Sequence, residues 1–256
     1  MKTLSTVLLF FAATLYTPSL VFAQQSNFEQ ATEQLEQQNY REAISQYQQI
    51  ADRGHHSGAL WFNLGIGYTQ LDSLGLAKYY FLKSSDYPQT KADAQSAIEY
   101  VNDRFNRRSA TLPTLPWERF SNYLSNQIGT SSLYSMALIF LYLGLAGILI
   151  FWFYGKFRTY SYYTGIGAVV MSFLLFVTAF YVQYFDNRYG TGVVIERQSI
   201  VYQSPDTSSS EISTAYEGYT VRVDYQESEN HQGWIYIRLE NGMKGWIENQ
   251  AVKALE

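Results

Sequence analysis

The chain has 256 residues and a formal net charge of −4, with 16% charged and 17% aromatic residues. Nucleic-acid binding requires a basic face, so this slightly acidic composition argues against a nucleic-acid partner. The absence of cysteine excludes disulfides, thiolate catalysis and cysteine-bound metal. Shifts in composition divide the chain into a polar helical part, an apolar part and a β-rich part.

The N-terminal segment has the pattern of a secretory signal. Met1-Lys2 precedes an apolar run from Leu4 to Leu15, and Val21 and Ala23 stand at −3 and −1 of a cleavage site. We therefore predict a signal peptide over residues 1–23, with an uncleaved N-terminal anchor as the alternative. Both interpretations export the segment that follows.

Residues 24–108 are rich in Gln, Glu and Ala, show helical periodicity and contain a repeat with a period of 34 residues. The recurring positions are Ala31, Ala43 and Tyr47, then Gly65, Ala77 and Phe81. The small residue of each set is expected to let two helices approach closely, while the aromatic residue fills the groove beside it.

The second repeat carries the most specific spacing, formed by Trp61, Leu64, Gly65, Tyr68, Ala77, Phe81 and Pro88. It resembles the tetratricopeptide pattern, although the first repeat has Asn27 and Gln34 in place of aromatic residues. A third helix, Lys91 to Arg107, is interpreted as a cap. We predict an all-α tetratricopeptide-like array, which is small enough to need a partner or self-association for stability.

Residues 109–132 are expected to be a linker, because Pro113 and Pro116 favour an extended chain. The apolar residues that follow share one helical face: Trp117, Phe120, Tyr123, Leu124 and Ile128. Two interpretations remain open for them. One is a helix in the lipid headgroup layer, and the other is a loop or short helix packed on protein.

Two uncharged apolar runs, residues 133–154 and 161–185, dominate the middle of the chain. Each exceeds the roughly 20 residues needed to cross a hydrocarbon core about 30 Å thick. The alternative, a soluble core, is disfavoured because soluble helices of this length have a polar face. Since the intervening loop, residues 155–160, is too short to hold a domain, we predict a transmembrane hairpin with both flanks on one side.

The charges at the hairpin support an orientation and a role. Lys156 and Arg158 place the loop in the cytoplasm by the positive-inside bias. Neither span contains Asp, Glu, Lys, Arg or His, so the hairpin is predicted to anchor the protein rather than to transport. A stripe of small residues, Thr164, Ala168 and Ser172, together with Gly144 and Gly147, favours close packing of helices.

The C-terminal segment, residues 193–256, alternates as strands do and follows a short polar passage, residues 186–192. Val221, Val223 and Tyr225 alternate, and residues 234–239 continue the pattern. Asn241-Gly242 supplies the residues of a two-residue type I′ turn. We predict an all-β small barrel.

This segment resembles a bacterial SH3 (SH3b) domain in four stretches, residues 201–205, 216–221, 233–237 and 241–247. The resemblance implies that Gly245 lets two sheets meet beside Trp246. It also implies an aromatic groove for cell-wall peptides or protein ligands. The residues that could line the groove, or equally belong to the core, are Tyr202, Tyr216, Trp234 and Tyr236.

No catalytic chemistry is evident in the sequence. His55, His56 and His231 have no ligand partner at a metal-binding spacing and are interpreted as surface residues. No nucleophile elbow or phosphate-binding glycine loop is present. We therefore predict that the protein is not an enzyme, uses no cofactor and binds no metal; a hydrolase without a standard motif is the alternative.

The order of signal peptide, tetratricopeptide array, paired spans and SH3b domain resembles the BatE-type proteins of the Bacteroidetes aerotolerance (Bat) operon. That resemblance implies a membrane complex with sibling Bat proteins and a link to stress or oxygen tolerance. We predict a two-pass inner-membrane scaffold whose two binding modules are both periplasmic.

Two kinds of partner follow from this prediction. A scaffold binds proteins, and the inner face of the array expected to meet them carries Phe28, Thr32, Leu35, Glu36, Phe62, Ile66, Thr69 and Gln70. The alternative is a sensor or tether whose SH3b domain binds peptidoglycan peptide. Residues 193–256 carry a net charge of −5, which disfavours anionic wall polymers and lipid headgroups as ligands.

Overall fold

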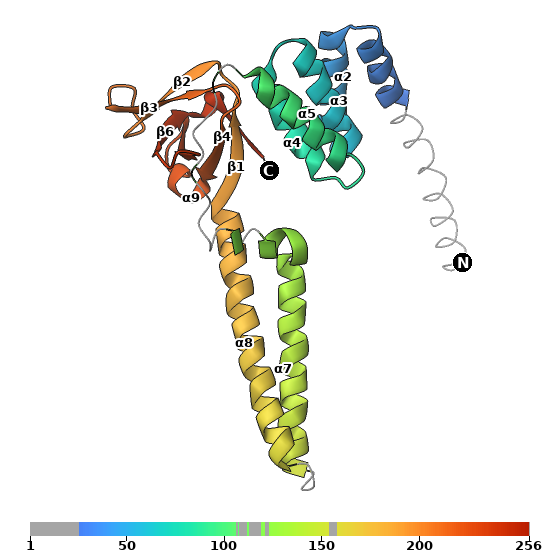
Figure 1. The fold of residues 1–256 in the computed structure, drawn as a ribbon, viewed down its shortest axis with the longest axis vertical. Helices are drawn as coiled ribbons and strands as arrows, with labels where there is room; N and C mark the ends of the chain where they lie inside the picture. The colour runs from blue at the N-terminus through green and yellow to red at the C-terminus, as the bar shows by residue number, and fades with distance from the viewer. Residues whose placement is uncertain are drawn as a thin grey trace, which may run out of the picture. The chain divides into compact units, whose positions relative to one another are not determined.

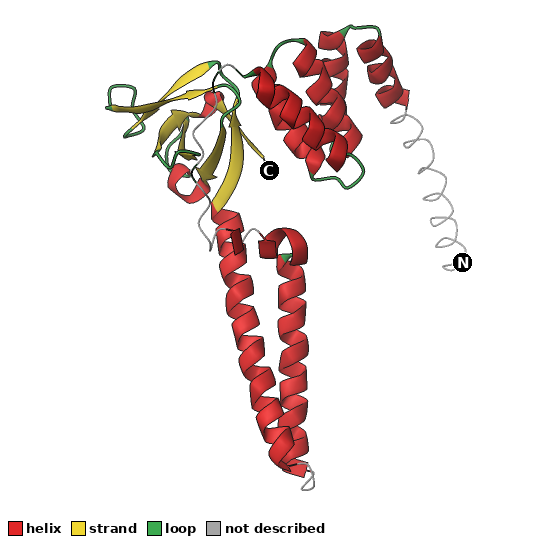
Figure 2. Cartoon of the chain, in the orientation of Figure 1, coloured by secondary structure: helices red, strands yellow, loops and turns green. Residues whose placement is uncertain are grey.

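The computed structural model describes residues 26–105, 107, 112, 119–120, 123–153 and 158–255. The predicted signal peptide, most of the predicted linker and residues 154–157 of the predicted loop lie outside these residues. The chain divides into two compact units, whose helices and strands are distinguished in Figure 1 and Figure 2. The first unit consists of the chain up to Ala110 together with residues 191–223 and 231–256. The second consists of residues 111–190 and 224–230.

The N-terminal part of the first unit is an array of helices. Residues 26–36 are helical, followed by α2 (Tyr40–Asp52), α3 (Gly58–Gln70), α4 (Leu74–Ser85) and α5 (Lys91–Arg104). The helix α3 begins where Ser57 accepts a hydrogen bond from the backbone N–H of Leu60, at 3.1 Å. The predicted third helix ends three residues early, at Arg104, because Phe105 is extended.

The packing inside the array follows the repeated positions. A Cβ on Gly65 would lie 2.5 Å from the ring of Phe81, so only glycine permits this approach of α3 and α4. At the equivalent place in the first repeat, Ala31 and Tyr47 are fully buried. The predicted pairing of a small residue with an aromatic one is therefore confirmed for Gly65 and Phe81, and Ala31 and Tyr47 lie in one buried cluster.

The other part of the first unit is a β domain built on a seven-stranded sheet in the order β3-β2-β6-β5-β4-β1-β7. The strands are β1 (Tyr189–Val194), β2 (Gln198–Tyr202), β3 (Glu211–Tyr216), β4 (Thr220–Asp224), β5 (Trp234–Leu239), β6 (Lys244–Glu248) and β7 (Val252–Leu255). The core is aliphatic, with Val193, Val201, Ile237 and Ile247 fully buried.

Three local predictions in this domain are wrong. The strand β4 ends at Asp224, and Tyr225 begins the short helix α9 (Tyr225–Ser228) because the Asp224 carboxylate caps it by accepting from Glu227 N–H. The β5–β6 turn is not type I′: Gly242 has a φ of +85°, but Asn241 is not among the described residues with positive φ. Gly242 N–H donates to the carbonyl of Leu239, which gives a longer loop with a left-handed glycine.

The predicted polar passage is instead the end of a helix followed directly by β1.

The helical array and the β domain share a hydrophobic core. Val193 of β1 is fully buried in the same cluster as Tyr47, Leu60 and Trp61 of the array, and Leu255 of β7 packs against it. The array was predicted to need a partner, and the chain's own β domain covers it in this structure.

The second unit is a hairpin of two long helices, α7 (Thr130–Phe153) and α8 (Arg158–Arg188). Both are long and apolar enough to cross a membrane. They extend beyond the predicted spans: α7 begins three residues earlier, and α8 takes in Arg158 at one end and Asp186 to Arg188 at the other. Many apolar side chains point away from the hairpin, as lipid-facing residues do, and Phe173 and Phe180 are 67% and 69% exposed.

Small residues bring α7 and α8 together. A Cβ on Gly147 would lie 2.8 Å from the Cα of Gly165, and the Ser172 hydroxyl donates to the carbonyl of Ala137 at 2.7 Å. The predicted stripe is only partly right, because Thr164 is exposed. The contact stripe of α8 runs through Ser161, Gly165 and Ser172 instead.

Little of the predicted linker helix is described. Leu124, in the short η1 helix (Leu124–Ile128), is buried against Leu133, Ala179 and Val182 of the hairpin. By contrast, Phe120 and Tyr123 are 59% and 61% exposed. Leu124 therefore packs on protein, as the second of the two interpretations predicts for it.

Candidate functional site

One face of the β sheet carries a row of aromatic side chains. Tyr202 of β2 and Tyr236 of β5 are the cross-strand neighbours of Trp246 in β6, on either side of it. Trp234 lies two residues before Tyr236 and therefore on the same face. We call Tyr202, Trp234, Tyr236 and Trp246 the aromatic row.

Ring contacts hold the aromatic row together. Tyr202 meets Trp234 edge to face at 5.6 Å between centroids, and Tyr236 meets Trp246 at 5.2 Å. Trp246 is 5% exposed, whereas the other three side chains are half-buried. The row thus consists of a buried tryptophan beneath partly exposed rings, which can offer flat apolar surface and polar edges to a ligand.

Gly245 allows the strands of the row to meet. A Cβ there would lie 2.6 Å from the carbonyl oxygen of Tyr202 and 2.7 Å from Val201. Gly245 was expected to let two sheets meet, but here it lets the neighbouring strands β2 and β6 of one sheet approach beside Trp246. Sequence reasoning assigned Trp246 only this structural context and so did not include it in the groove.

His231 also belongs to this site. Its ring lies 4.4 Å from that of Trp246 in an edge-to-face arrangement, and the residue is half-buried. The prediction of a surface histidine is therefore too simple for His231, whereas His55 and His56 are exposed. The sequence did contain one indication of this contact, since His231 lies just before Gly233-Trp234, in the connection between β4 and β5.

Tyr216, the fourth residue predicted for the groove, lies apart from the row. It ends β3 opposite Gln198, and its ring contacts Tyr219 at 5.7 Å. The Arg107 guanidinium stacks over the Tyr216 ring at 4.4 Å and donates to its hydroxyl at 2.8 Å. The structure therefore brings together Tyr202, Trp234 and Tyr236 but not Tyr216.

The residues predicted for the inner face of the array lie in two different clusters. Phe28 and Leu35 pack on the cluster around Tyr47, while Phe62 and Ile66 pack on Phe81 and Val101. Thr32 and Thr69 use their hydroxyls within the array, on the carbonyls of Phe28 and Gly65. Glu36 and Gln70 are exposed and accessible to a partner.

A hydrogen bond joins the β domain to the N-terminus of α4. The Glu217 carboxylate accepts a hydrogen bond from Gly75 N–H at 2.7 Å, and Ser73, at the N-cap position, makes no side-chain cap. A carboxylate at this end also interacts favourably with the helix dipole. Gly75 is required there, because a Cβ would lie 2.8 Å from the carbonyl of Val194.

Lys78, one turn further along α4, reaches the same β turn. Its ammonium donates to the carbonyl of Gly218 at 2.7 Å, and burial lowers the pKa of Lys78. Gly218 has a φ of +82°, and its Cα faces the ring of Phe105 at the end of α5. We call Gly75, Lys78, Phe105, Glu217 and Gly218 the docking contact.

The family comparison agrees with the geometry of the sheet. A bacterial SH3 domain is found at residues 198–253. The match includes every residue of the aromatic row, together with Glu217 and Gly218. None of the curated proteins compared matches the chain. The match suggests a cell-wall or peptide-binding module at residues 198–253, and the array and the hairpin lie outside it.

Proposed function

We propose that this protein is a membrane-anchored binding protein whose bacterial SH3 domain holds a peptide segment of a partner on the aromatic row. The observation that carries this proposal is the row itself: half-buried Tyr202, Trp234 and Tyr236 over a buried Trp246. Rings of this kind bury much apolar area at little conformational cost, and they dominate recognition surfaces.

The hairpin supports an anchoring role in this proposal. Residues 133–153 of α7 and 161–185 of α8 contain no Asp, Glu, Lys, Arg or His, so these stretches offer none of the charged groups of a proton or ion relay. The array precedes the hairpin and the bacterial SH3 domain follows it, yet both belong to one compact unit. We therefore propose a two-pass protein of the inner membrane with this unit on the periplasmic side, acting by binding and not by catalysis.

A scaffold for a protein complex is the form of this function that we favour. The array adds the exposed Glu36 and Gln70 as a second contact surface, which is the arrangement of a tetratricopeptide-like adaptor. Sibling Bat proteins, which the domain order suggests, are the partners to test first. The alternative is a tether to the cell wall, in which the aromatic row holds peptidoglycan stem peptide in place of a protein partner. The bacterial SH3 match favours this alternative.

Two assays on the full-length protein separate these forms. Crosslinking in native membranes, followed by identification of the attached proteins, should capture a defined partner that Trp234→Ala loses and Met243→Ala retains. Met243 is the matched control because it is exposed on the β5–β6 turn outside the row. Co-sedimentation with purified wall that depends on Trp234 would favour the tether, and binding in both assays unaffected by Trp234→Ala would contradict a role for the row.

The array can be tested at residues whose loss does not disturb its packing. The ring centroids of Phe62 and Phe81 are 5.4 Å apart. Truncation of Phe62 would therefore destabilise the array, and a loss of partner binding could not be assigned to the surface alone. Glu36→Ala and Gln70→Ala avoid this problem because both side chains are exposed. Loss of partner capture in these variants supports the adaptor, and unchanged capture of every partner contradicts it.

A further inference from the structure

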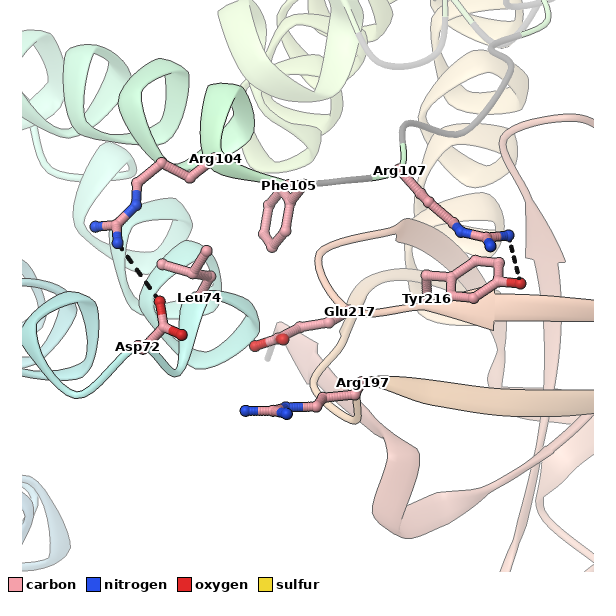
Figure 3. A pocket seen from close by; sticks show the side chains of 8 residues that line it. All are labelled: Asp72, Leu74, Arg104, Phe105, Arg107, Arg197, Tyr216 and Glu217. Carbon is pink, nitrogen blue, oxygen red and sulfur yellow. Dashed lines mark hydrogen bonds and ion pairs between the residues drawn. The ribbon is translucent and has the colours of Figure 1, made fainter.

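Many polar side chains of this protein find partners within the chain. In the cavity of about 430 Å³ beside the docking contact, Arg104 pairs with Asp72 at 3.5 Å, and Arg107 donates to the Tyr216 hydroxyl at 2.8 Å (Figure 3). Hydroxyls along the hairpin donate to backbone carbonyls, namely those of Ser135, Ser161, Thr164, Ser172 and Thr178. A polar group without a partner in protein or lipid is costly, so an exception is informative.

Tyr142, in the middle of α7, is such an exception. It lies about 16–18 Å along the helix axis from Thr130 and from Phe153. Its side chain is 69% exposed, and its hydroxyl forms no hydrogen bond with any residue that the structure describes. A tyrosine side chain is too short to reach the lipid headgroups from this depth. The other exposed tyrosines of the hairpin helices lie within about two turns of a helix end: Tyr160, Tyr162, Tyr163, Tyr181 and Tyr184.

Tyr142 also belongs to an exposed seam of α7. Residues that alternate three and four positions apart line one edge of a helix, as in a coiled coil. From Tyr142 in both directions, this spacing gives a set of residues that are all exposed: Ser135, Leu138, Tyr142, Leu145, Leu149 and Trp152. We call this set the α7 seam. The contact of α7 with α8 uses a different side of the helix, where a Cβ on Gly144 would lie 2.6 Å from Val169.

A second copy of the chain fits the α7 seam better than lipid does. Copies inserted in the same orientation hold Tyr142 at the same depth, and in a parallel left-handed pair the equivalent seam positions face one another. A phenol hydroxyl is both a donor and an acceptor, so two Tyr142 side chains can hydrogen-bond to each other. Lipid tails offer neither a donor nor an acceptor. The second copy satisfies the hydroxyl without any residue from another protein.

We propose that two copies of the chain pair through the α7 seam, with the Tyr142 hydroxyls hydrogen-bonded to each other near the middle of the membrane. The polar residue fixes the register of the pair, while Leu138, Leu145 and Leu149 supply the packing. Pairing places two aromatic rows in one assembly, which raises avidity for a ligand with repeated sites. The proposal rests on the proposed membrane anchor and is independent of the ligand of the aromatic row.

Disulfide crosslinking in native membranes tests the contact. Because the chain has no cysteine, a single substitution in the full-length protein reports one position. With copper phenanthroline as the oxidant, Leu145→Cys and Leu149→Cys should form dimers, and chains co-expressed with two different affinity tags should give dimers that carry both tags. The matched controls are Leu143→Cys and Ile150→Cys, at similar depths. These positions are 58% and 42% exposed but lie about 100° around the helix from the seam, so they should stay monomeric.

The hydroxyl is tested by association in phosphatidylcholine vesicles. Energy transfer between full-length chains labelled at Ser208→Cys with a donor or an acceptor dye gives the dissociation constant of the pair. Tyr142→Phe removes only the hydroxyl and should raise this constant about three- to tenfold. Tyr163→Phe, at a position that is 70% exposed near the end of the span, is the control and should leave the constant unchanged.

The outcomes distinguish this proposal from the anchor itself. Equal crosslinking at seam and control positions, or equal dissociation constants for Tyr142→Phe and wild type, would overturn the pairing. A crosslinked product that joins one tagged chain to a different protein would rule out a second copy as the occupant. Membrane retention in sodium carbonate without any dimer would contradict the α7 seam alone, whereas release by carbonate would contradict the anchor as well.

Discussion

Lys78 and Gly218 are 140 positions apart in the chain, yet the ammonium of Lys78 donates a 2.7 Å hydrogen bond to the carbonyl of Gly218. The whole predicted membrane hairpin lies between them in the sequence. A chain that crosses a membrane once between these residues could not form this contact. For a hairpin that crosses a membrane, the contact therefore requires a return of the chain to the side from which it left.

We expect Lys78→Met to weaken the docking contact. Methionine fills similar space but leaves the buried carbonyl of Gly218 without its donor, which lowers the free energy of unfolding by about 1–3 kcal/mol. The net loss is smaller, because the variant no longer has to bury a lysine ammonium. The thermal midpoint of the full-length protein in detergent should fall by about 2–4 °C for each 1 kcal/mol lost. Lys91→Met, at an exposed position of α5, is the control, and equal shifts in both variants would contradict the docking role.

The same lysine predicts a pH dependence. Burial lowers the pKa of folded Lys78 below the usual value of 10.5. Between the two values the unfolded chain binds more protons than the folded one, so the contribution of Lys78 to the free energy of unfolding rises with pH. The stability difference between wild type and Lys78→Met should therefore increase as pH approaches about 10.5. A difference that decreases over this range would be inconsistent with a buried Lys78.

Glu217→Ala should remove a cap that one domain supplies to the other. The loss of a capping side chain costs about 0.5–2 kcal/mol, and hydrogen exchange at the start of α4 should become faster. Glu217→Gln keeps an acceptor oxygen and should recover most of the protection. Glu211→Ala, at an exposed position of β3, should leave α4 unchanged. Equal exchange in all three variants would exclude Glu217 as the cap.

Gly245→Ala should destabilise the bacterial SH3 domain. A methyl group at this position would lie 2.6 Å from the carbonyl of Tyr202, and the overpacking costs about 1–3 kcal/mol. The near-ultraviolet circular dichroism of the aromatic row should change with it. At Gly233 no atom lies within 4 Å of an added Cβ, so Gly233→Ala reports backbone strain alone and should leave the ring contacts intact.

The elements of this fold were predictable because their signals are local. The spacing from Gly65 to Phe81 and the uncharged runs each specify a helix or a helix pair within a short stretch. The turn after Leu239 was mispredicted because Asn-Gly is compatible with more than one loop length, and the register of β5 with β6 decides among them.

The docking contact and the cavity were not predictable in the same way. Gly75 and Glu217 are 142 positions apart, and nothing near either residue in the sequence indicates the other. The aromatic row was predicted in part, because alternation places Trp234 and Tyr236 on one face. Trp246 joins it through cross-strand pairing, and His231 contacts Trp246 from the β4–β5 connection; the sequence of one strand contains neither relationship.

The central claim is that the array and the bacterial SH3 domain lie on the outer side of a membrane that the hairpin crosses twice. Because the chain has no cysteine, single substitutions Gln30→Cys, Lys156→Cys and Ser208→Cys report the array, the hairpin loop and the bacterial SH3 domain separately. In intact spheroplasts a membrane-impermeant maleimide should label positions 30 and 208, and should label position 156 only after lysis. Labelling of just one of positions 30 and 208 before lysis would contradict the account.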